Sequence, residues 1–264
     1  MQCLRMNFSN LGRKVSLNKA KNRLGFSLLE LLVVISIIAV FASILAPVYV
    51  NAKKSAARSK CQSNLRQIAN AFELYTSDHA GCYPNLNNQY LWAGFYWREP
   101  IRKYVARSKS DDKNSVLSCP SDPTPPGIYA ATSYAYSASF YMTPEQVNAI
   151  ENNDYIRAKF AATNPKLPCT TMKTSAVKFA KKKVLVAEYW TLHSDNPKVG
   201  WYDDLETTGN DPWSGARNYL FADGHVVYLE TKRIHPADSP VVSRPRLLPD
   251  INLTRDGVAG KDVD

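Results

Sequence analysis

Few side chains in this 264-residue sequence have the types and spacing that catalysis requires. Its four histidines are His79, His193, His225 and His235. No nucleophile elbow, phosphate-binding loop or HExxH motif accompanies them. Glu188, His193 and Asp195 are close enough in sequence to bind a metal ion, although such scattered residues are more often solvated loop side chains. We therefore expect a protein that is not an enzyme.

One loop is rich in the oxygen ligands that calcium prefers. It contains Asp203, Asp204, Glu206, Asn210 and Asp211. Hard oxygen ligands at short spacing suit Ca²⁺, but no recognised calcium-binding spacing is met. A calcium site and a set of solvated loop acids both remain open, and no other cofactor is expected.

The five cysteines are Cys3, Cys61, Cys82, Cys119 and Cys169. They form no CxxC pair, so a zinc site is poorly supported. Without Cys3, which lies near the N-terminus, an even number remains. That number fits one or two disulfides in an oxidising compartment. Four cysteines allow three complete pairings, and their spacing does not choose among them.

Glu30 is the one charged residue in an apolar run from Phe26 to Val50. The run is close to the roughly 20 residues that a helix needs to cross a bilayer. A carboxylate at the bilayer centre costs about 2.5–3.5 kcal/mol, and less near the edge. Such a group usually has a partner or a function, so Glu30 is a candidate functional residue.

Residues 1–25 form a basic leader without acidic residues. Its basic residues are Arg5, Arg13, Lys14, Lys19, Lys21 and Arg23. The positive flank predicts that the leader stays cytoplasmic and that the C-terminal part is translocated. Removing these six from the 33 lysines and arginines leaves 27 against 23 acidic residues, a net charge of +4. No nucleic-acid partner is therefore expected.

Two common targeting signals fit this N-terminus poorly. A secretory signal peptide would be cut at small residues after the apolar run, and Ala46-Pro47 is unsuitable there. A plain signal anchor would have no use for Glu30. The segment Gly25-Phe26-Ser27-Leu28-Leu29-Glu30, after basic residues and before an apolar run, instead resembles the type III signal of type IV prepilins and type II secretion pseudopilins.

The resemblance implies roles for four residues. It implies cleavage between Gly25 and Phe26 by a prepilin peptidase, followed by N-methylation of Phe26. It also implies that Glu30, fifth in the mature chain, pairs with the N-terminal amine of a neighbouring subunit, which would satisfy the buried charge. Pro47 is similar to the helix-kinking proline that the family often carries.

Three further segments resemble a bacterial group of prepilin-like proteins named for a His, nine residues and Asp-Gly near the C-terminus. They are residues 57–68, 117–122 and 219–226. Trp213 departs from the pattern, because it stands where the histidine is expected. Major pseudopilins often hold calcium in a C-terminal loop, which makes Asp203, Asp204, Glu206 and Asp211 candidate ligands here. Because Cys61 and Cys119 lie in the matching segments, the resemblance favours that disulfide and leaves Cys82 with Cys169; four separate thiols are the alternative.

The predicted fold class is α+β, with a long N-terminal hydrophobic helix packed on a small antiparallel-sheet head, as in pilins. An apolar stripe at helical spacing continues the helix beyond the membrane: Cys61, Leu65, Ile68, Phe72 and Tyr75. Strands are expected within residues 133–142 and 184–188. The pair Asp223-Gly224 predicts a two-residue hairpin turn with both residues at positive φ. Thr143 and Gln146 predict a capping box.

The predicted organisation has four parts. They are a cleaved leader (1–25), a helix (26–78) with a transmembrane part at about 26–50, a head (79–230) and a loosely ordered C-terminal tail (231–264). An aromatic cluster either packs the core or binds carbohydrate or a partner; it contains Tyr90, Trp92, Phe95, Tyr96 and Trp97.

Together these features predict a structural subunit of a type II secretion pseudopilus or type IV pilus-like filament. Its expected partners are the prepilin peptidase, the inner-membrane assembly platform and other pilin-like subunits. The chain would cross the bacterial inner membrane once, with its N-terminus cytoplasmic and its head extracytoplasmic, and enter a periplasmic or surface filament. The alternative is a membrane-anchored ectodomain that binds carbohydrate or calcium, or that is catalytic.

Overall fold

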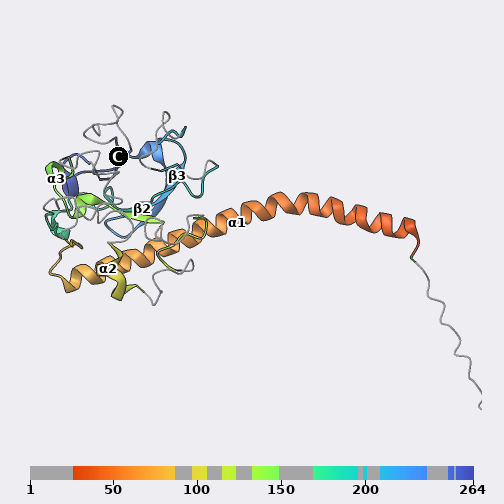
Figure 1. Ribbon diagram of the computed structural model, residues 1–264, viewed down its shortest axis with the longest axis horizontal. Helices are drawn as coiled ribbons and strands as arrows, with labels where there is room; N and C mark the ends of the chain where they lie inside the picture. Colours follow the sequence, from red (N-terminus) through yellow and green to blue (C-terminus); the bar gives the residue numbers. More distant parts are fainter. Residues whose placement is uncertain are drawn as a thin grey trace, which may run out of the picture. The chain divides into compact units, whose positions relative to one another are not determined.

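The structure is a computed structural model of the 264-residue chain. It describes residues 26–86, 97–105, 115–122, 133–148, 169–195, 199–200, 209–236, 249–252 and 254–264. The chain divides into two compact units, Met1–Val48 and Tyr49–Asp264. Figure 1 shows the helices and strands along the chain. The helices are α1 (Leu28–Asp78), α2 (Arg98–Ile101) and α3 (Pro144–Asn148).

Short 3₁₀ turns connect several of these elements. They are η1 (Arg102–Tyr104), η3 (Ala138–Phe140), η4 (Thr174–Ala176), η5 (Thr231–Arg233) and η6 (Gly257–Ala259). The strands are β1 (Tyr134–Tyr136), β2 (Val184–Glu188), β3 (Ala216–Phe221) and β4 (Val226–Glu230). They form a four-stranded sheet in the order β1-β2-β3-β4, with every neighbouring pair antiparallel. A long N-terminal helix with an antiparallel sheet is the predicted α+β, pilin-like class.

Helix α1 ends where the chain turns into the left-handed region. Ala80 and Gly81 have φ of 52° and 78°, and the Gly81 N–H donates to the Thr76 carbonyl over 2.8 Å. Left-handed residues after a helix satisfy its last carbonyls in this way. The predicted helix is therefore confirmed, although it begins at Leu28 rather than Phe26.

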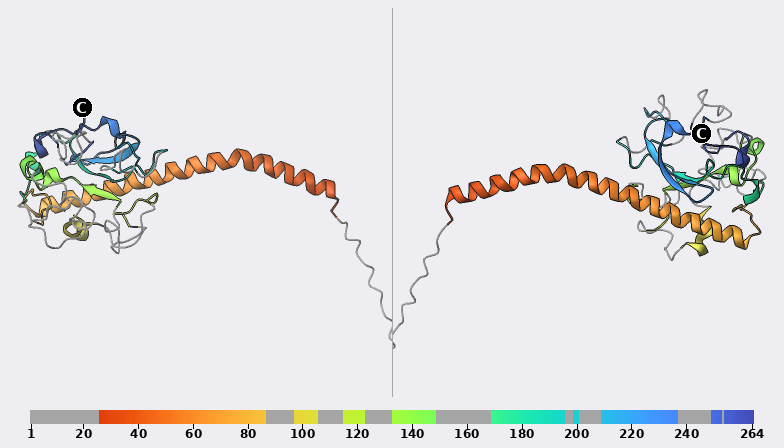
Figure 2. Two further views of the ribbon diagram at one scale, coloured as in Figure 1. Left: turned by 45° about the horizontal axis from the view of Figure 1, so that its top comes forward. Right: turned by 180° about the vertical axis from the view of Figure 1, so that it is seen from behind.

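In the second unit, the later turns of α1 pack on one face of the sheet (Figure 2). The predicted stripe is buried throughout: Cys61, Leu65, Ile68, Phe72 and Tyr75. The sheet residues in the same hydrophobic cluster include Tyr134, Tyr136, Val186 and Leu220. Alternate residues along a strand point to opposite faces, so Ala135, Ala187, Tyr219 and Phe221 form a second cluster on the other face. Apolar side chains therefore cover both faces of the sheet.

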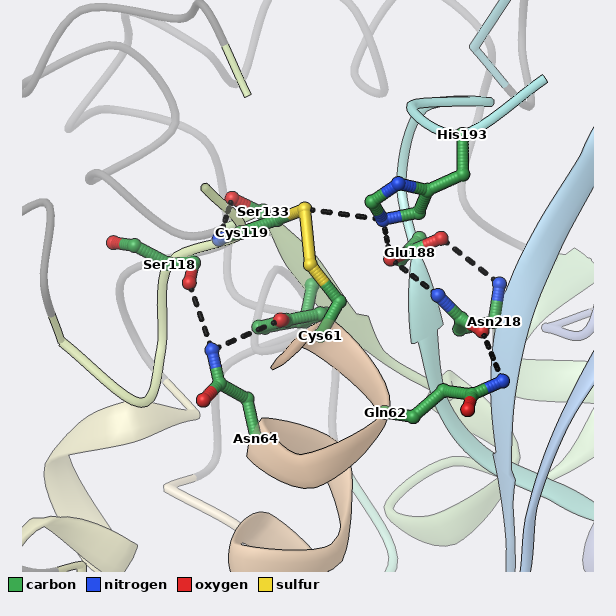
Figure 3. The surroundings of a disulfide bond; sticks show 10 residues. Cys61, Gln62, Asn64, Ser118, Cys119, Ser133, Glu188, His193 and Asn218 are labelled. Atoms are coloured by element: carbon green, nitrogen blue, oxygen red, sulfur yellow. Dashed lines mark hydrogen bonds and ion pairs between the residues drawn. A yellow bond between two sulfur atoms is a disulfide. The ribbon is translucent and has the colours of Figure 1, made fainter. Parts of the chain in front are cut away.

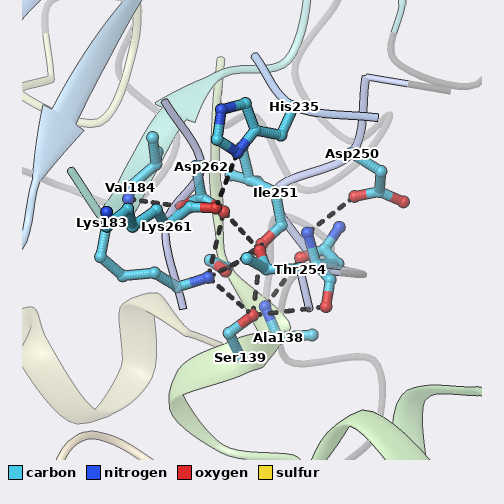
Figure 4. Close-up of polar contacts among 12 residues, drawn as sticks. Ala138, Ser139, Lys183, Val184, His235, Asp250, Ile251, Thr254, Lys261 and Asp262 are labelled. Atoms are coloured by element: carbon cyan, nitrogen blue, oxygen red, sulfur yellow. Dashed lines mark hydrogen bonds and ion pairs between the residues drawn. The ribbon is translucent and has the colours of Figure 1, made fainter. Parts of the chain in front are cut away.

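The second face is covered by described C-terminal residues, which corrects the expectation of a loosely ordered tail for residues 231–236, 249–252 and 254–264. Ile234, Ile251 and Val263 belong to the second cluster. The Asp262 carboxylate pairs with Lys183 and also accepts the Val184 N–H over 2.7 Å, beside Ser139 and Thr254 (Figure 4). Apart from the short turn η6, residues 249–252 and 254–264 are held by individual contacts, which leave no periodic pattern in the sequence.

The β3–β4 hairpin differs in detail from its prediction. The Phe221 N–H donates to the His225 carbonyl over 2.9 Å, which leaves Ala222, Asp223 and Gly224 in a three-residue loop. Only Gly224 in that loop has positive φ, at 86°. The expected two-residue turn is therefore wrong, and the geometry is the three-residue hairpin with a final left-handed glycine.

The segment around residue 140 contains an expected strand and an expected capping box. The expected strand over 133–142 is confined to β1, and η3 follows it. The capping box at the start of α3 is confirmed: the Thr143 N–H donates to Gln146 Oε1 over 2.9 Å, and the Gln146 N–H donates to Thr143 Oγ1 over 3.3 Å.

Candidate functional site

Ser27 and Glu30 form a capping box at the first turn of α1. The Ser27 N–H donates to Glu30 Oε2 over 2.9 Å, and the Glu30 N–H donates to Ser27 Oγ over 3.1 Å. Each side chain thus satisfies a backbone donor that a helix start leaves open. The Ser-x-x-Glu spacing is the sequence signal for this capping box, which was missed because Glu30 was expected only to contact a neighbouring subunit. Glu30 therefore has a local structural role as well.

The apolar part of α1 exposes its side chains in the isolated chain. The large apolar residues from Phe26 to Val50 are all exposed, and the helix is long and apolar enough to cross a membrane. Ser36 and Ser43 satisfy their hydroxyls by donating to the carbonyls of Val33 and Val40. Pro47 lies inside α1, which continues through it.

The predicted processing residues lie at the edge of the described chain. Phe26 is exposed ahead of the helix, and Gly25 lies outside the described residues. Cleavage, methylation and the subunit contact of Glu30 stay predictions.

A second group of candidate residues surrounds a disulfide in the head (Figure 3). The disulfide joins Cys61 on α1 to Cys119, with their Cα atoms 5.4 Å apart and both side chains buried. The Cys119 N–H donates to Ser133 Oγ over 2.8 Å, and Asn64 Nδ2 donates to the Ser118 carbonyl over 2.9 Å. These contacts fix the segment that carries Cys119 against both α1 and the residue before β1.

Cys82 and Cys169 are not joined by a disulfide. Cys82 forms an isolated antiparallel bridge with Lys173, and the Tyr83 N–H donates to the Met172 carbonyl. Cys82 is therefore opposite Lys173, four residues beyond Cys169, and not opposite Cys169 itself. The proposed disulfide between Cys82 and Cys169 is thus corrected, because neither residue forms one.

Glu188, at the end of β2, brings a buried carboxylate to the disulfide. Its Oε2 accepts the Asn218 N–H over 2.9 Å, and its Oε1 accepts Asn218 Nδ2 over 2.9 Å. Asn218 in turn accepts a hydrogen bond from Gln62 Nε2 over 3.1 Å. The carboxylate is fully buried and is held in place by β3 and, through Asn218, by α1.

His193 completes the group from the turn after β2. Its Nε2 lies 3.1 Å from Glu188 Oε1 and 3.3 Å from Cys119 Sγ, and its side chain is 1% exposed. Its Nδ1 is buried without a hydrogen-bond partner in the described part of the chain. We call this group the Cys–Glu–His cluster; its four ligand atoms lie within 4.8 Å of one another, and its members are Cys61, Cys119, Glu188 and His193.

The cluster does not have the geometry of a nucleophilic triad. In such a triad one imidazole nitrogen faces the nucleophile and the other faces the carboxylate. Here Nε2 faces both the sulfur and the carboxylate, and both sulfurs are in the disulfide. Two sulfurs, one imidazole and one carboxylate are, however, a donor set that zinc accepts.

The structure brings together two of the three residues that the sequence suggests for a metal site. Glu188 and His193 are adjacent, but the carboxylate of Asp195 is exposed and pairs with Lys54 at 3.8 Å. Neither cysteine was expected to join them, because residues so far apart in sequence carry no spacing signal. Asn218 was missed for the same reason.

The acidic loop remains largely outside the described residues. Asp203, Asp204 and Glu206 are not described, while Asp211 Oδ1 accepts the Trp213 N–H over 3.1 Å. The calcium site therefore stays a prediction.

The described part of the aromatic cluster belongs to the core. Trp97 is fully buried and stacks on Phe72 with ring centroids 5.9 Å apart. The remaining predicted members lie outside the described residues; these are Tyr90, Trp92, Phe95 and Tyr96.

Comparison with known proteins supports the prediction of a prepilin-type signal at the N-terminus. The family model described as the prokaryotic N-terminal methylation motif matches residues 20–46, which include the Gly25-Phe26 junction, the capping box and the first part of α1. No curated protein and no solved structure matches the chain. The chain thus carries a prokaryotic N-terminal methylation motif of the kind typical of prepilin-like proteins.

Proposed function

We propose that this chain is a structural subunit of a type II secretion pseudopilus or a type IV pilus-like filament. The single observation that carries the proposal is the methylation motif over residues 20–46, placed on a helix whose apolar side chains are exposed in the isolated chain. In this proposal a prepilin peptidase cuts between Gly25 and Phe26, and an inner-membrane platform assembles the mature chain with other pilin-like subunits.

The exposed apolar helix supports assembly as well as membrane anchoring. From Phe26 to Val50 its large apolar residues have no covering partner within the described chain. Lipid covers such a surface before assembly, and the equivalent helices of sister subunits cover it afterwards. The later turns are already buried in the head, so the exposed part alone is available for either role.

Glu30 supplies the register of the assembly. It is the only charged side chain between Phe26 and Lys53. Cleavage would create a positive amine at Phe26, and an oppositely charged partner makes a carboxylate tolerable in an apolar environment. A neighbouring chain therefore docks most favourably where its amine meets this carboxylate.

The capping box allows the assembly role of Glu30 to be tested apart from its structural role. Glu30→Gln removes the charge but keeps a side chain that can complete a capping box. Ser27→Ala removes the cap and keeps the charge. Both variants and the wild type would be expressed in a host with a prepilin peptidase and an assembly platform, followed by cross-linking of neighbouring subunits and mass spectrometry of the mature N-terminus.

We expect a methylated Phe26 in the wild type, and loss of cross-linked multimers in Glu30→Gln but not in Ser27→Ala. Deletion of the peptidase should leave the leader in place. A chain that keeps its leader beside an active peptidase, with no multimers, would contradict the proposal and favour an anchored binding or catalytic ectodomain. Equal multimer yields from Glu30→Gln and the wild type would remove Glu30 from the mechanism.

A further inference from the structure

We propose that the Cys–Glu–His cluster binds one zinc ion when the Cys61–Cys119 disulfide is reduced. The oxidised and zinc-bound forms exclude each other, because each uses both sulfur atoms. The cluster lies wholly within the unit Tyr49–Asp264, so the proposal does not rest on processing or assembly of the N-terminal helix.

The donor set and its spacing fit zinc. Tetrahedral Zn²⁺ with bonds of about 2.0–2.3 Å holds its ligand atoms about 3.3–3.8 Å apart. The Nε2 atom of His193 already lies 3.3 Å from Cys119 Sγ and 3.1 Å from Glu188 Oε1. Opening the disulfide separates the sulfurs, and the remaining pairs of ligand atoms, all within 4.8 Å, then close to the tetrahedral spacing.

Burial favours a closed site with four protein ligands. Both cysteines are at most 3% exposed, Glu188 is fully buried, and the His193 side chain is 1% exposed. Structural zinc sites are closed and four-coordinate, whereas catalytic sites keep one position for water or substrate. We therefore infer a structural ion that joins α1, the Cys119 segment and the turn after β2.

Neighbouring side chains orient the carboxylate ligand. Asn218 donates to both oxygens of Glu188, and Gln62 donates to Asn218. Partners of this kind fix the direction of a metal ligand, and their loss typically weakens metal affinity. The carboxylate is thus already positioned before an ion arrives.

The chemistry balances with a dithiol as the reductant. The dithiol supplies two electrons and two protons to the Cys61–Cys119 bond and itself becomes a disulfide. Zinc then displaces two thiol protons to solvent. Zinc binds imidazole through an unprotonated nitrogen, so any proton on Nε2 of His193 is also released to solvent when the ion binds.

The test uses the full chain in detergent micelles, with cobalt as a spectroscopic substitute for zinc. The chain is reduced with a phosphine, the phosphine is removed, and Co²⁺ is added under nitrogen. We expect thiolate-to-cobalt charge transfer and the visible bands of tetrahedral Co²⁺ at a stoichiometry of one ion per chain, bleached by Zn²⁺. The oxidised chain should show neither the charge-transfer absorption nor the tetrahedral Co²⁺ bands.

Variants assign the ligands. Glu188→Gln and His193→Gln should each lose the tetrahedral spectrum, while Asn218→Leu should weaken zinc affinity by about 10–100-fold. Cys82→Ser, which changes a thiol outside the cluster, should behave as the wild type. If Glu188→Gln and His193→Gln both keep the wild-type spectrum and affinity, other thiols hold the metal and the proposal is wrong.

Mapping of the thiols covers the case in which reduction unfolds the head. Zinc should slow alkylation of Cys61 and Cys119 but not of Cys82, as located by peptide mass spectrometry. If the reduced chain loses its circular dichroism, zinc should restore it, because binding energy at such a site is also folding energy. A reduced chain that remains unfolded, or in which Cys61 and Cys119 are alkylated as fast as Cys82 with zinc present, overturns the proposal.

Discussion

The ammonium nitrogen of Lys183 lies 3.1 Å from Asp262 Oδ1, and each of the two side chains is at most 1% exposed. This pair joins the residue before β2 to the third residue from the C-terminus. Lys183 Nζ also donates to Thr254 Oγ1 over 2.7 Å and to Ser139 Oγ over 3.1 Å. Burial lowers the pKa of Lys183, and the charge of Asp262 opposes that shift. The C-terminal residues therefore supply the counter-ion of a core lysine.

Removing Asp262 alone should destabilise the head strongly. Asp262→Leu leaves a buried ammonium without its counter-ion, and breaking such a pair costs about 3–5 kcal/mol. The double variant Lys183→Met/Asp262→Leu should recover most of that loss. Urea unfolding of the full chain in micelles, followed by tryptophan fluorescence, measures the free energies, with Lys181→Met as an exposed control. A change below about 1 kcal/mol in Asp262→Leu would show that the pair is not stabilising.

Loss of the Cys61–Cys119 disulfide should also lower stability in the absence of zinc. The two residues are 58 positions apart, and closing a loop of that length in the unfolded chain corresponds to about 4 kcal/mol in the chain-entropy model. The double variant Cys61→Ala/Cys119→Ala should unfold at a lower urea concentration than Cys82→Ala. Reductant should lower the wild-type midpoint and leave that of the double variant unchanged; sensitivity of the double variant to reductant would contradict the assignment.

Alkaline pH should weaken the fold through Tyr83. Burial raises the pKa of Tyr83 from 10.0 to about 12. A raised folded-state pKa gives stability that is complete below the unfolded value and is lost as pH rises through the folded value. The loss therefore falls between pH 10.0 and about 12, at about 1.4 kcal/mol per pH unit, or roughly 3 kcal/mol in all. In Tyr83→Phe the free energy of unfolding should fall less steeply with pH over this range, by the contribution of one proton. Equal slopes in the variant and the wild type would contradict this.

Crowding at Gly215 should make alanine more harmful there than at Gly209. Both glycines have positive φ, at 75° and 71°, so the backbone cost of about 1–2 kcal/mol is common to both substitutions. A Cβ at Gly215 would lie 2.7 Å from Thr191 Cγ2, whereas nothing lies within 4 Å at Gly209. The difference in unfolding free energy between the two variants measures the clash. Equal losses of unfolding free energy would show that the turn containing Thr191 and His193 shifts to accommodate the added Cβ without cost.

The sequence by itself was sufficient to predict the N-terminal leader and the long helix that follows it. A basic leader, one carboxylate in an apolar run and an apolar stripe at helical spacing are local patterns, and together they predict one long helix with a membrane-spanning first part. The two capping boxes are equally local, because three-residue spacing alone brings their side chains together. The chain itself encodes such contacts wherever neighbours in sequence become neighbours in space.

The tertiary structure decided what the head contains. The Cys–Glu–His cluster gathers residues 61, 119, 188 and 193. The Lys183–Asp262 pair joins two residues that are 79 positions apart in the sequence. Neither has a sequence spacing of its own, because sheet pairing and the packing of α1 set their distances. The hairpin at Asp223-Gly224 illustrates the intermediate case: the sequence predicted a turn, but the pairing of Phe221 with His225 fixed its length.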